Sequence, residues 1–187
     1  MYGREVAEEY LPSKIRRLRC FRGENSGYQG FYELTHMEEI DIRTTYSCSP
    51  DYFLYLYNRV GKPWRWFEMN ELPKDKLVSW LKNQRVISLL KNGEPIGFGS
   101  IEEYENTSNI SYFGLVPEAI GKGYGRKFLS FVTSMAFDNA KLSVSLYTTD
   151  TDHPNAYPSY LKEGFKLEEC RTIYQYAPIL IFHKEEI

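Results

Sequence analysis

Glycines at every second position of the segment 121–125 restrict the fold of this chain more than any other feature of its sequence. The segment lies between residues 109–116, which alternate as a β-strand does, and residues 128–136, whose apolar positions follow a helical period. Glycine allows tight turns and close approach of a ligand, and the first N–H groups of a helix carry partial positive charge. With Lys122 and Arg126 added, this strand–loop–helix junction predicts a site for a phosphate or pyrophosphate.

Two common phosphate-binding loops do not match the segment. A Walker loop needs Gly-Lys followed by Ser or Thr, and the chain contains no such run. A dinucleotide fingerprint has the spacing G-x-G-x-x-G, whereas the spacing here is G-x-G-x-G and follows several strands. A structural turn with spare glycines is the alternative interpretation, and the spacing alone leaves it open.

Alternating segments and helical segments surround this loop. Ser49, Pro50 and Asp51 are typical of a helix start, Gly164 is typical of a helix end, and Asn92-Gly93 predicts a hairpin turn. The pattern predicts an α/β fold in which a mixed, mostly antiparallel sheet has helices on both faces. The expected helices cover 50–58, 73–81, 128–136 and 155–163, and the expected strands cover 85–91, 95–105, 109–116, 142–148, 167–176 and 178–183.

Length and composition limit the class of protein. A chain of 187 residues suits one domain, which we expect at 31–187 behind an N-terminal extension at 1–30. Lys and Arg number 23 and Asp and Glu 25, so the formal charge of −2 argues against a dedicated nucleic-acid binder. The three cysteines have no metal-ligand spacing, so we expect no metal and a reducing compartment. No secretory leader and no apolar run of membrane length is visible, which predicts a cytoplasmic protein with no membrane partner.

Three features keep two interpretations each. Residues 14–22 are locally basic and either contact phosphates or form a solvated face. Trp64, Arg65 and Trp66 form either a stacking platform for a substrate or a lid over the core. The 16 tyrosines either pack in the ordinary way or line a ligand groove.

The glycine loop follows a known pattern. Gly123 and Gly125 occupy the two small positions of the motif Arg/Gln-x-x-Gly-x-Gly/Ala, and Ile120 replaces its first residue. Residues 114–118, Gly-Leu-Val-Pro-Glu, look like the strand end that precedes this motif. On these residues the chain resembles the GCN5-related N-acetyltransferase (GNAT) family, whose members bind acetyl-CoA at this loop.

A second motif downstream strengthens the resemblance. The family pattern Asn-x-x-Ala-x-x-x-Tyr-x-x-x-Gly-Phe is matched in register at Ala156, Tyr160, Gly164 and Phe165, while His153 replaces Asn. Two motifs at the right separation are more specific than either alone.

One subgroup of the family looks closer still. Its Thr-x-x-Asp-His-Pro segment matches Thr149, Asp152, His153 and Pro154, and its Val-Gly-x-Pro-Trp-x-Trp stretch matches residues 60–66. Together the motifs identify the chain as a member of the GNAT family and imply its acyl-CoA N-acyltransferase fold.

The resemblance implies the substrates and the residues that hold them. Acetyl-CoA is the expected co-substrate, and a primary amine of a small molecule or protein attacks it directly in a ternary complex; a homodimer stays open. The strand at 112–116 is expected to part from its neighbour and to pair with the pantetheine arm. The acceptor is expected beside Trp64, Arg65 and Trp66. The residues expected to contact acetyl-CoA are Leu115, Val116, Gly121, Lys122, Gly123, Tyr124, Gly125 and Arg126.

The resemblance assigns the chemistry less completely. Tyr160 is implied as the general acid for the departing thiolate, but a tyrosine with a pKa near 10 is a weak donor to a thiol near 8.5. Either its pKa is lowered or it only hydrogen-bonds the developing charge. Asn109 stands where many family members have a glutamate base, so Glu102, Glu103 and His153 are the candidate bases, with water as a further alternative.

Two other functions stay open at this point. A non-catalytic module of the same fold could sense acyl-CoA, although the retained Tyr160 favours an enzyme. A nucleic-acid-associated protein could use residues 14–22, although the charge of −2 disfavours it.

Overall fold

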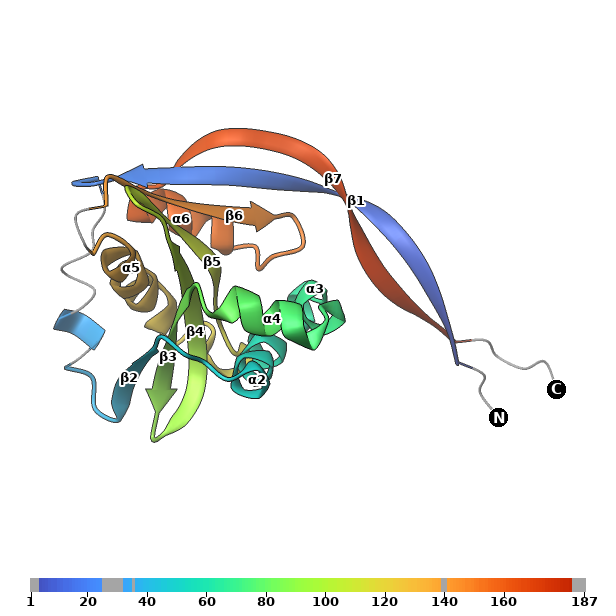
Figure 1. Cartoon of the computed structure of the whole chain (residues 1–187), viewed down its shortest axis with the longest axis horizontal. Coiled ribbons are helices and arrows are strands. Elements are labelled where there is room, and N and C mark those ends of the chain that lie inside the picture. The colour runs from blue at the N-terminus through green and yellow to red at the C-terminus, as the bar shows by residue number, and fades with distance from the viewer. Residues whose placement is uncertain (1–3, 25–31, 35, 139–140, 183–187) are drawn as a thin grey trace.

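The computed structural model describes residues 4–24, 32–34, 36–138 and 141–182 of the chain. Its centre is a seven-stranded sheet in the order β2-β3-β4-β5-β6-β1-β7, with helices on both faces (Figure 1). The mixed α/β fold predicted from the sequence is therefore confirmed. The elements are β1 (Arg4–Phe21), β2 (Ile40–Thr45), α2 (Pro50–Gly61), η1 (Lys62–Trp64), α3 (Glu68–Glu71), α4 (Lys74–Leu81), β3 (Gln84–Lys91), β4 (Glu94–Glu103), β5 (Thr107–Leu115), η2 (Pro117–Ala119), α5 (Tyr124–Ala136), β6 (Ser143–Thr149), α6 (Ala156–Glu163) and β7 (Lys166–Phe182).

Local signals in the sequence account for several element ends. The Ser49 hydroxyl accepts a hydrogen bond from the backbone N–H of Tyr52 at 3.3 Å and so caps α2. Asn92 and Gly93 both have positive φ values, as a two-residue hairpin turn between β3 and β4 requires. Gly164 ends α6 with a φ of 105°. These three predictions are confirmed.

The first strand departs most from the sequence prediction. The sequence predicts an extension at 1–30, but Arg4–Phe21 forms β1, which pairs antiparallel with both β6 and β7. Leu18 and Cys20 are fully buried, so the arginines that alternate with them lie on the opposite face of the strand. In the sequence, the many charged residues of this segment hide the alternation of buried and exposed positions. The strands that pair with it, β6 and β7, also lie far along the chain, so no local signal predicts the pairing. The boundary at residue 31 therefore cuts through the sheet.

The last strand is longer than predicted. The sequence predicts separate strands at 167–176 and 178–183, whereas the structure has one strand, β7, over Lys166–Phe182. Pro178 lies opposite Glu8 in this strand, and β7 is an edge of the sheet, where strands tolerate proline. The outer halves of β1 and β7 leave the rest of the molecule as a two-stranded ribbon (Figure 1).

The two central strands, β5 and β6, part along their length. They run parallel and pair only as far as Ile110 and Leu146, although β5 stays paired with β4 up to Leu115. The register between β4 and β5 shifts at this point and leaves Ser111 as an extra residue on β5. Such a bulge bends a strand locally. The second half of β5 therefore has an unpaired edge in the middle of the sheet.

Aromatic side chains pack α2 and the loop after it against this part of the sheet. Phe53 lies edge-on to Phe98 with ring centroids 6.0 Å apart, and Tyr57 lies edge-on to Tyr112 at 5.2 Å. The Trp66 ring lies 5.2 Å from that of Tyr112. Each such pair contributes about 0.5–1.5 kcal/mol beyond its buried area. Many of the aromatic residues thus stabilise the core.

Candidate functional site

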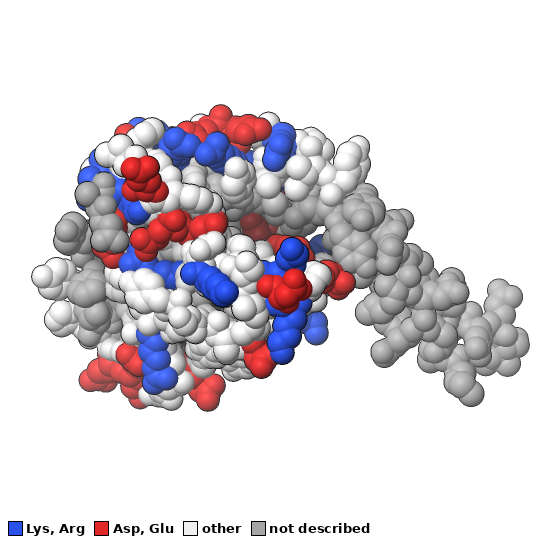
Figure 2. All heavy atoms as spheres, viewed as in Figure 1, with Lys and Arg blue, Asp and Glu red and all other residues white. Residues whose placement is uncertain are grey.

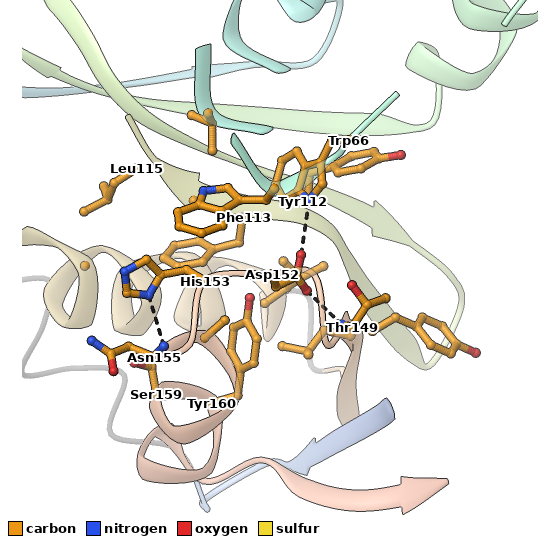
Figure 3. A pocket seen from close by; sticks show the side chains of 18 of the residues that line it. Trp66, Tyr112, Phe113, Leu115, Thr149, Asp152, His153, Asn155, Ser159 and Tyr160 are labelled. Carbon is orange, nitrogen blue, oxygen red and sulfur yellow. Dashed lines mark hydrogen bonds between the residues drawn. The ribbon is translucent and has the colours of Figure 1, made fainter. Parts of the chain in front are cut away.

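A cavity of about 410 Å³ occupies the opening between β5 and β6. Its walls come from these strands, from the loop after α2 and from α6, and it reaches the start of α5 (Figure 3). Backbone N–H and C=O groups on the unpaired edge of β5, from Ser111 to Leu115, face no strand and can bond a ligand. The cavity has the size range of small-molecule sites.

The glycine loop lies at one end of this cavity. Gly121 and Gly123 have φ values of 79° and 84°, which residues with a side chain rarely adopt. Gly123 is the N-cap of α5 and offers no side chain to the first N–H groups of the helix. A Cβ on Gly125 would lie 3.5 Å from Leu115 Cδ1, so a methyl group fits there but a long side chain points into the cavity. The junction presents N–H groups and the positive end of a helix dipole to an anion.

Of the residues expected to contact acetyl-CoA, some line the cavity and others do not. Tyr124 is buried, and its hydroxyl accepts a hydrogen bond from Lys91 Nζ at 3.2 Å, away from the cavity. Leu115, Gly121, Gly125 and Arg126 line the cavity, whereas Val116, Lys122, Gly123 and Tyr124 do not.

Tyr160 points into the cavity from α6, with its hydroxyl directed toward Asp152 (Figure 3). Burial raises the pKa of the phenol well above its usual value, and the negative charge of Asp152 raises the pKa further. The hydroxyl therefore stays protonated at neutral pH and can donate a hydrogen bond. Of the two alternatives for Tyr160, a lowered pKa is disfavoured.

Asp152 lies at the centre of a hydrogen-bond network that the sequence does not reveal. Its Oδ1 accepts a bond from Trp66 Nε1 at 3.2 Å. Its Oδ2 accepts bonds from the Thr148 hydroxyl and the Thr149 N–H, each at 2.8 Å. A carboxylate has about four acceptor sites, so one site is left for a ligand or water. The only sequence signal was its place in the Thr-x-x-Asp-His-Pro segment, where an acid follows a strand end.

His153 is held as a hydrogen-bond donor. Its Nδ1 accepts the backbone N–H of Asn155 at 3.0 Å, so the neutral ring carries its proton on Nε2. The ring packs edge-on against Trp64, with centroids 5.0 Å apart. In this arrangement Nδ1 is engaged within the loop, and the His153 ring lines the cavity.

The sequence matches a known family over the part of the chain that forms this site. The model of the acetyltransferase (GNAT) family matches residues 49–165, which is more than half of the chain. The chain belongs to the GNAT family. This match spans the elements from α2 to α6, which contribute most of the cavity wall.

Solved structures share the GNAT fold with this chain. A conserved protein of unknown function from Staphylococcus epidermidis has a TM-score of 0.62 and 19% identity over 87% of this chain and 61% of that protein. A GCN5-related N-acetyltransferase from Sphaerobacter thermophilus has a TM-score of 0.57 and 12% identity over 97% of this chain and 61% of that protein. A GCN5-related N-acetyltransferase from Kribbella flavida has a TM-score of 0.56 and 10% identity over 92% of this chain and 59% of that protein.

At such low identities, these similarities show a shared fold and nothing more. The chain spans about three fifths of the length of each of these relatives. No curated protein matches the chain in sequence. No described helix is both long and apolar enough to cross a bilayer. Within the described ranges, no three His, Cys, Asp or Glu side chains gather as a metal ion would need.

The segment after α2 serves both the core and the cavity of this GNAT domain. Trp64, Arg65 and Trp66 all line the cavity. Trp66 also packs among the core rings, as the lid interpretation predicts, while a stacking platform for a substrate stays a prediction. Glu68, which the sequence does not single out, lines the cavity too, and its Oε1 accepts the Tyr112 hydroxyl at 3.0 Å. Burial, and then the charge of Glu68, raises the pKa of Tyr112.

The two glutamates expected as bases lie elsewhere. Glu102 and Glu103 stand at the paired end of β4, opposite Asn109 and the residue before it, and neither lines the cavity. Glu103 makes an ion pair with the buried Arg85 at 3.2 Å. Among the residues that the structure describes, the carboxylates that line the cavity are those of Glu68 and Asp152.

Proposed function

We propose that this GNAT protein transfers the acetyl group of acetyl-CoA to a primary amine, by direct attack within a ternary complex. The observation that carries the proposal is the parting of β5 from β6 beside the start of α5. An unpaired strand edge can bond the amide groups of pantetheine, and a glycine loop at a helix start can bind the pyrophosphate. Arg126, at the same end of the cavity, adds positive charge.

The acceptor amine enters from the aromatic end of the cavity. Trp64, Arg65 and Trp66 form its wall, and the carboxylates of Glu68 and Asp152 face the same space. A carboxylate attracts an ammonium ion and stabilises the positive charge that forms on nitrogen during attack. The cavity therefore favours a cationic acceptor.

In the reaction the amine nitrogen attacks the thioester carbonyl, the C–N bond forms and the C–S bond breaks. The Tyr160 hydroxyl donates a hydrogen bond to the departing sulfur, in accord with its raised pKa. Because only a neutral nitrogen can attack, the bound ammonium first gives one proton to Asp152 through water. The proton released when the C–N bond forms passes to solvent, and the thiolate takes a proton from solvent. His153, which also lines the cavity, can donate a second hydrogen bond through its Nε2–H group.

The test is thiol release from acetyl-CoA over a panel of primary amines, with the acetylated product identified by mass spectrometry. We expect thiol and N-acetyl product in equal amounts with at least one amine. Acetyl-CoA binding without turnover across the panel would instead favour a non-catalytic acyl-CoA sensor. Absence of acetyl-CoA binding would contradict both functions.

A further inference from the structure

A second hollow of about 380 Å³ lies at the paired end of β5 and β6. Along β1 and β6, Leu18 and Val144 are fully buried, and the side chains that alternate with them line the hollow. The hollow is therefore on the sheet face opposite to these two residues. Its lining consists of Arg17, Arg19, Tyr104, Thr107, Asn109, Ser143, Ser145 and Tyr147, which are all polar or tyrosine.

Arg17 and Arg19 give this hollow its charge. Their Nε atoms lie 3.5 Å and 3.0 Å from the two carboxylate oxygens of Glu168 on β7. Neither guanidinium makes a side-chain hydrogen bond to any residue in the part of the chain that the structure describes. A guanidinium carries five N–H donors, and both side chains line the hollow, so they have N–H groups to offer a ligand there.

Further charged residues lie around the hollow but do not line it. Lys141 is buried, and its ammonium donates to the backbone carbonyls of Tyr104 and Glu105. Glu102 accepts a hydrogen bond from the Tyr104 hydroxyl. The charged side chains in the described lining are Arg17 and Arg19, so the lining itself is positively charged, while Glu168 and Glu169 stand beside it on β7. Figure 2 shows Lys and Arg interspersed with Asp and Glu on one face of the molecule.

Neutral donors connect the hollow to the acetyl-transfer cavity. The Ser145 hydroxyl donates to Asn109 Oδ1 at 3.2 Å, and Asn109 Nδ2 donates to the Ser111 hydroxyl at 3.4 Å. Ser111 lines the cavity, and Tyr147 lines both the cavity and the hollow. Paired arginines with hydroxyl groups beside them are the donor set that carboxylates and phosphates prefer.

We propose that this hollow binds a carboxylate or phosphate group of the acceptor, at the end of the molecule opposite its amine. The inference rests on the proposed acetyl transfer. Arg17 pairs with Tyr147, and Arg19 with Ser145, so Thr149 beside Asp152 lies two and four residues farther along β6. At about 3.3 Å per residue, the anion and the amine are about 7–13 Å apart. The acceptor is then an amine with a distant anionic group, and an α-amino acid acting through its α-amine is too short.

The test compares acceptors that differ only at that end: ω-aminohexanoate, ω-aminohexyl phosphate and the uncharged ω-aminohexanol. We expect Arg19→Gln and Arg17→Gln each to raise the KM of the better anionic acceptor by about tenfold and to leave that of ω-aminohexanol unchanged. Glu168→Gln should lower the KM of the anionic acceptor by about threefold, since it removes the competing carboxylate. Arg43→Gln, at an exposed ion pair on β2, is the matched control and should change neither.

The KM of the anionic acceptor should rise in the two arginine variants and fall in Glu168→Gln. If the ion pairs served only to support the structure, their loss would raise the KM in all three variants. Equal KM changes for charged and uncharged acceptors, or none, would overturn the inference while leaving acetyl transfer intact. Calorimetry with hexanoate and inorganic phosphate gives a readout without turnover. Binding that Arg19→Gln removes and Glu168→Gln strengthens supports the anion site even if acetyl transfer fails, and no binding by the unaltered chain contradicts it.

Discussion

The two ends of the β5–β6 pair use the same strands in opposite ways. At one end, Thr107–Ile110 and Ser143–Leu146 satisfy each other's backbone groups, so only side chains are left to recognise a ligand. At the other end, the strands part after Ile110, and the backbone of β5 itself faces a cavity lined by aromatic rings. Phe113 and Tyr160 lie edge-on in this gap, with centroids 6.4 Å apart. A parted strand pair can thus supply a site for an extended ligand, whereas a closed pair supplies one for a compact ion.

Removing the Tyr160 hydroxyl should have the largest effect at the parted end. Tyr160→Phe keeps the ring and its packing, so the fold should be retained. If the hydroxyl stabilises the departing thiolate, kcat should fall by about 10²–10⁴-fold while acetyl-CoA affinity changes less than about threefold. Steady-state kinetics and calorimetry on this one variant measure both. Because the pKa of Tyr160 is raised, its ionisation should cause no loss of kcat at mildly alkaline pH. An unaltered kcat would remove Tyr160 from the chemistry.

A charge at the start of α5 should act on the cofactor alone. Gly125→Glu directs a carboxylate into the end of the cavity where the pyrophosphate is expected, and like charges in contact are unfavourable by several kcal/mol. We expect acetyl-CoA affinity to fall by about 100-fold and its effect on the melting temperature to disappear. Gly125→Ala is the control, since a Cβ there makes only ordinary contact with Leu115. Equal behaviour of the two variants would contradict the pyrophosphate site.

The aromatic wall should act on the acceptor. Trp66→Phe keeps a ring in the core but removes the N–H that binds Asp152, whereas Trp66→Ala also leaves a core cavity. We expect the phenylalanine variant to raise the acceptor KM by about tenfold and to leave the acetyl-CoA KM nearly unchanged. Initial rates with each substrate varied in turn measure this. Equal changes in both KM values would favour a role in the core alone.

The smallest expected effect concerns the paired end of β5 and β6, where a buried thiol on the neighbouring β1 should make the stability of the fold depend on pH. Cys20 lies opposite Val144 on β6, and burial raises the pKa of its thiol from 9.0 to about 12. The folded chain keeps this proton where the unfolded chain loses it, so the stabilisation present below pH 9 is lost as the pH rises toward about 12. We expect the free energy of unfolding to fall by about 1 kcal/mol per pH unit in this window.

Cys20→Ala should have a shallower fall in the same urea titrations. Cys48, whose thiol pKa burial raises to about 11, remains in that variant and accounts for part of the slope. Identical slopes for the variant and the unaltered chain would mean that Cys20 is accessible to solvent in the folded state.

The sequence by itself determined the local features of this GNAT protein. The Ser49 cap, the Asn92-Gly93 turn and the Gly164 helix end follow from the conformational preferences of single residues, which act over a few positions. The glycine loop was found from the spacing within one strand–helix unit, which is also a local property, and Tyr160 was implied by the resemblance to a family motif. Membership of the family and the mixed sheet followed from these segments together.

Only the tertiary structure decided which distant segments share a surface. Alternation indicates that neighbours on a strand face opposite sides, but it does not say which side holds a site, so Glu102 and Glu103 remained candidates while Glu68 went unnoticed. The basic segment 14–22 has the same hydropathy whether it is solvated or lies within a sheet. Its place beside β6 depends on pairing with residues such as Thr149, and long-range contacts of this kind leave no periodic trace in the chain.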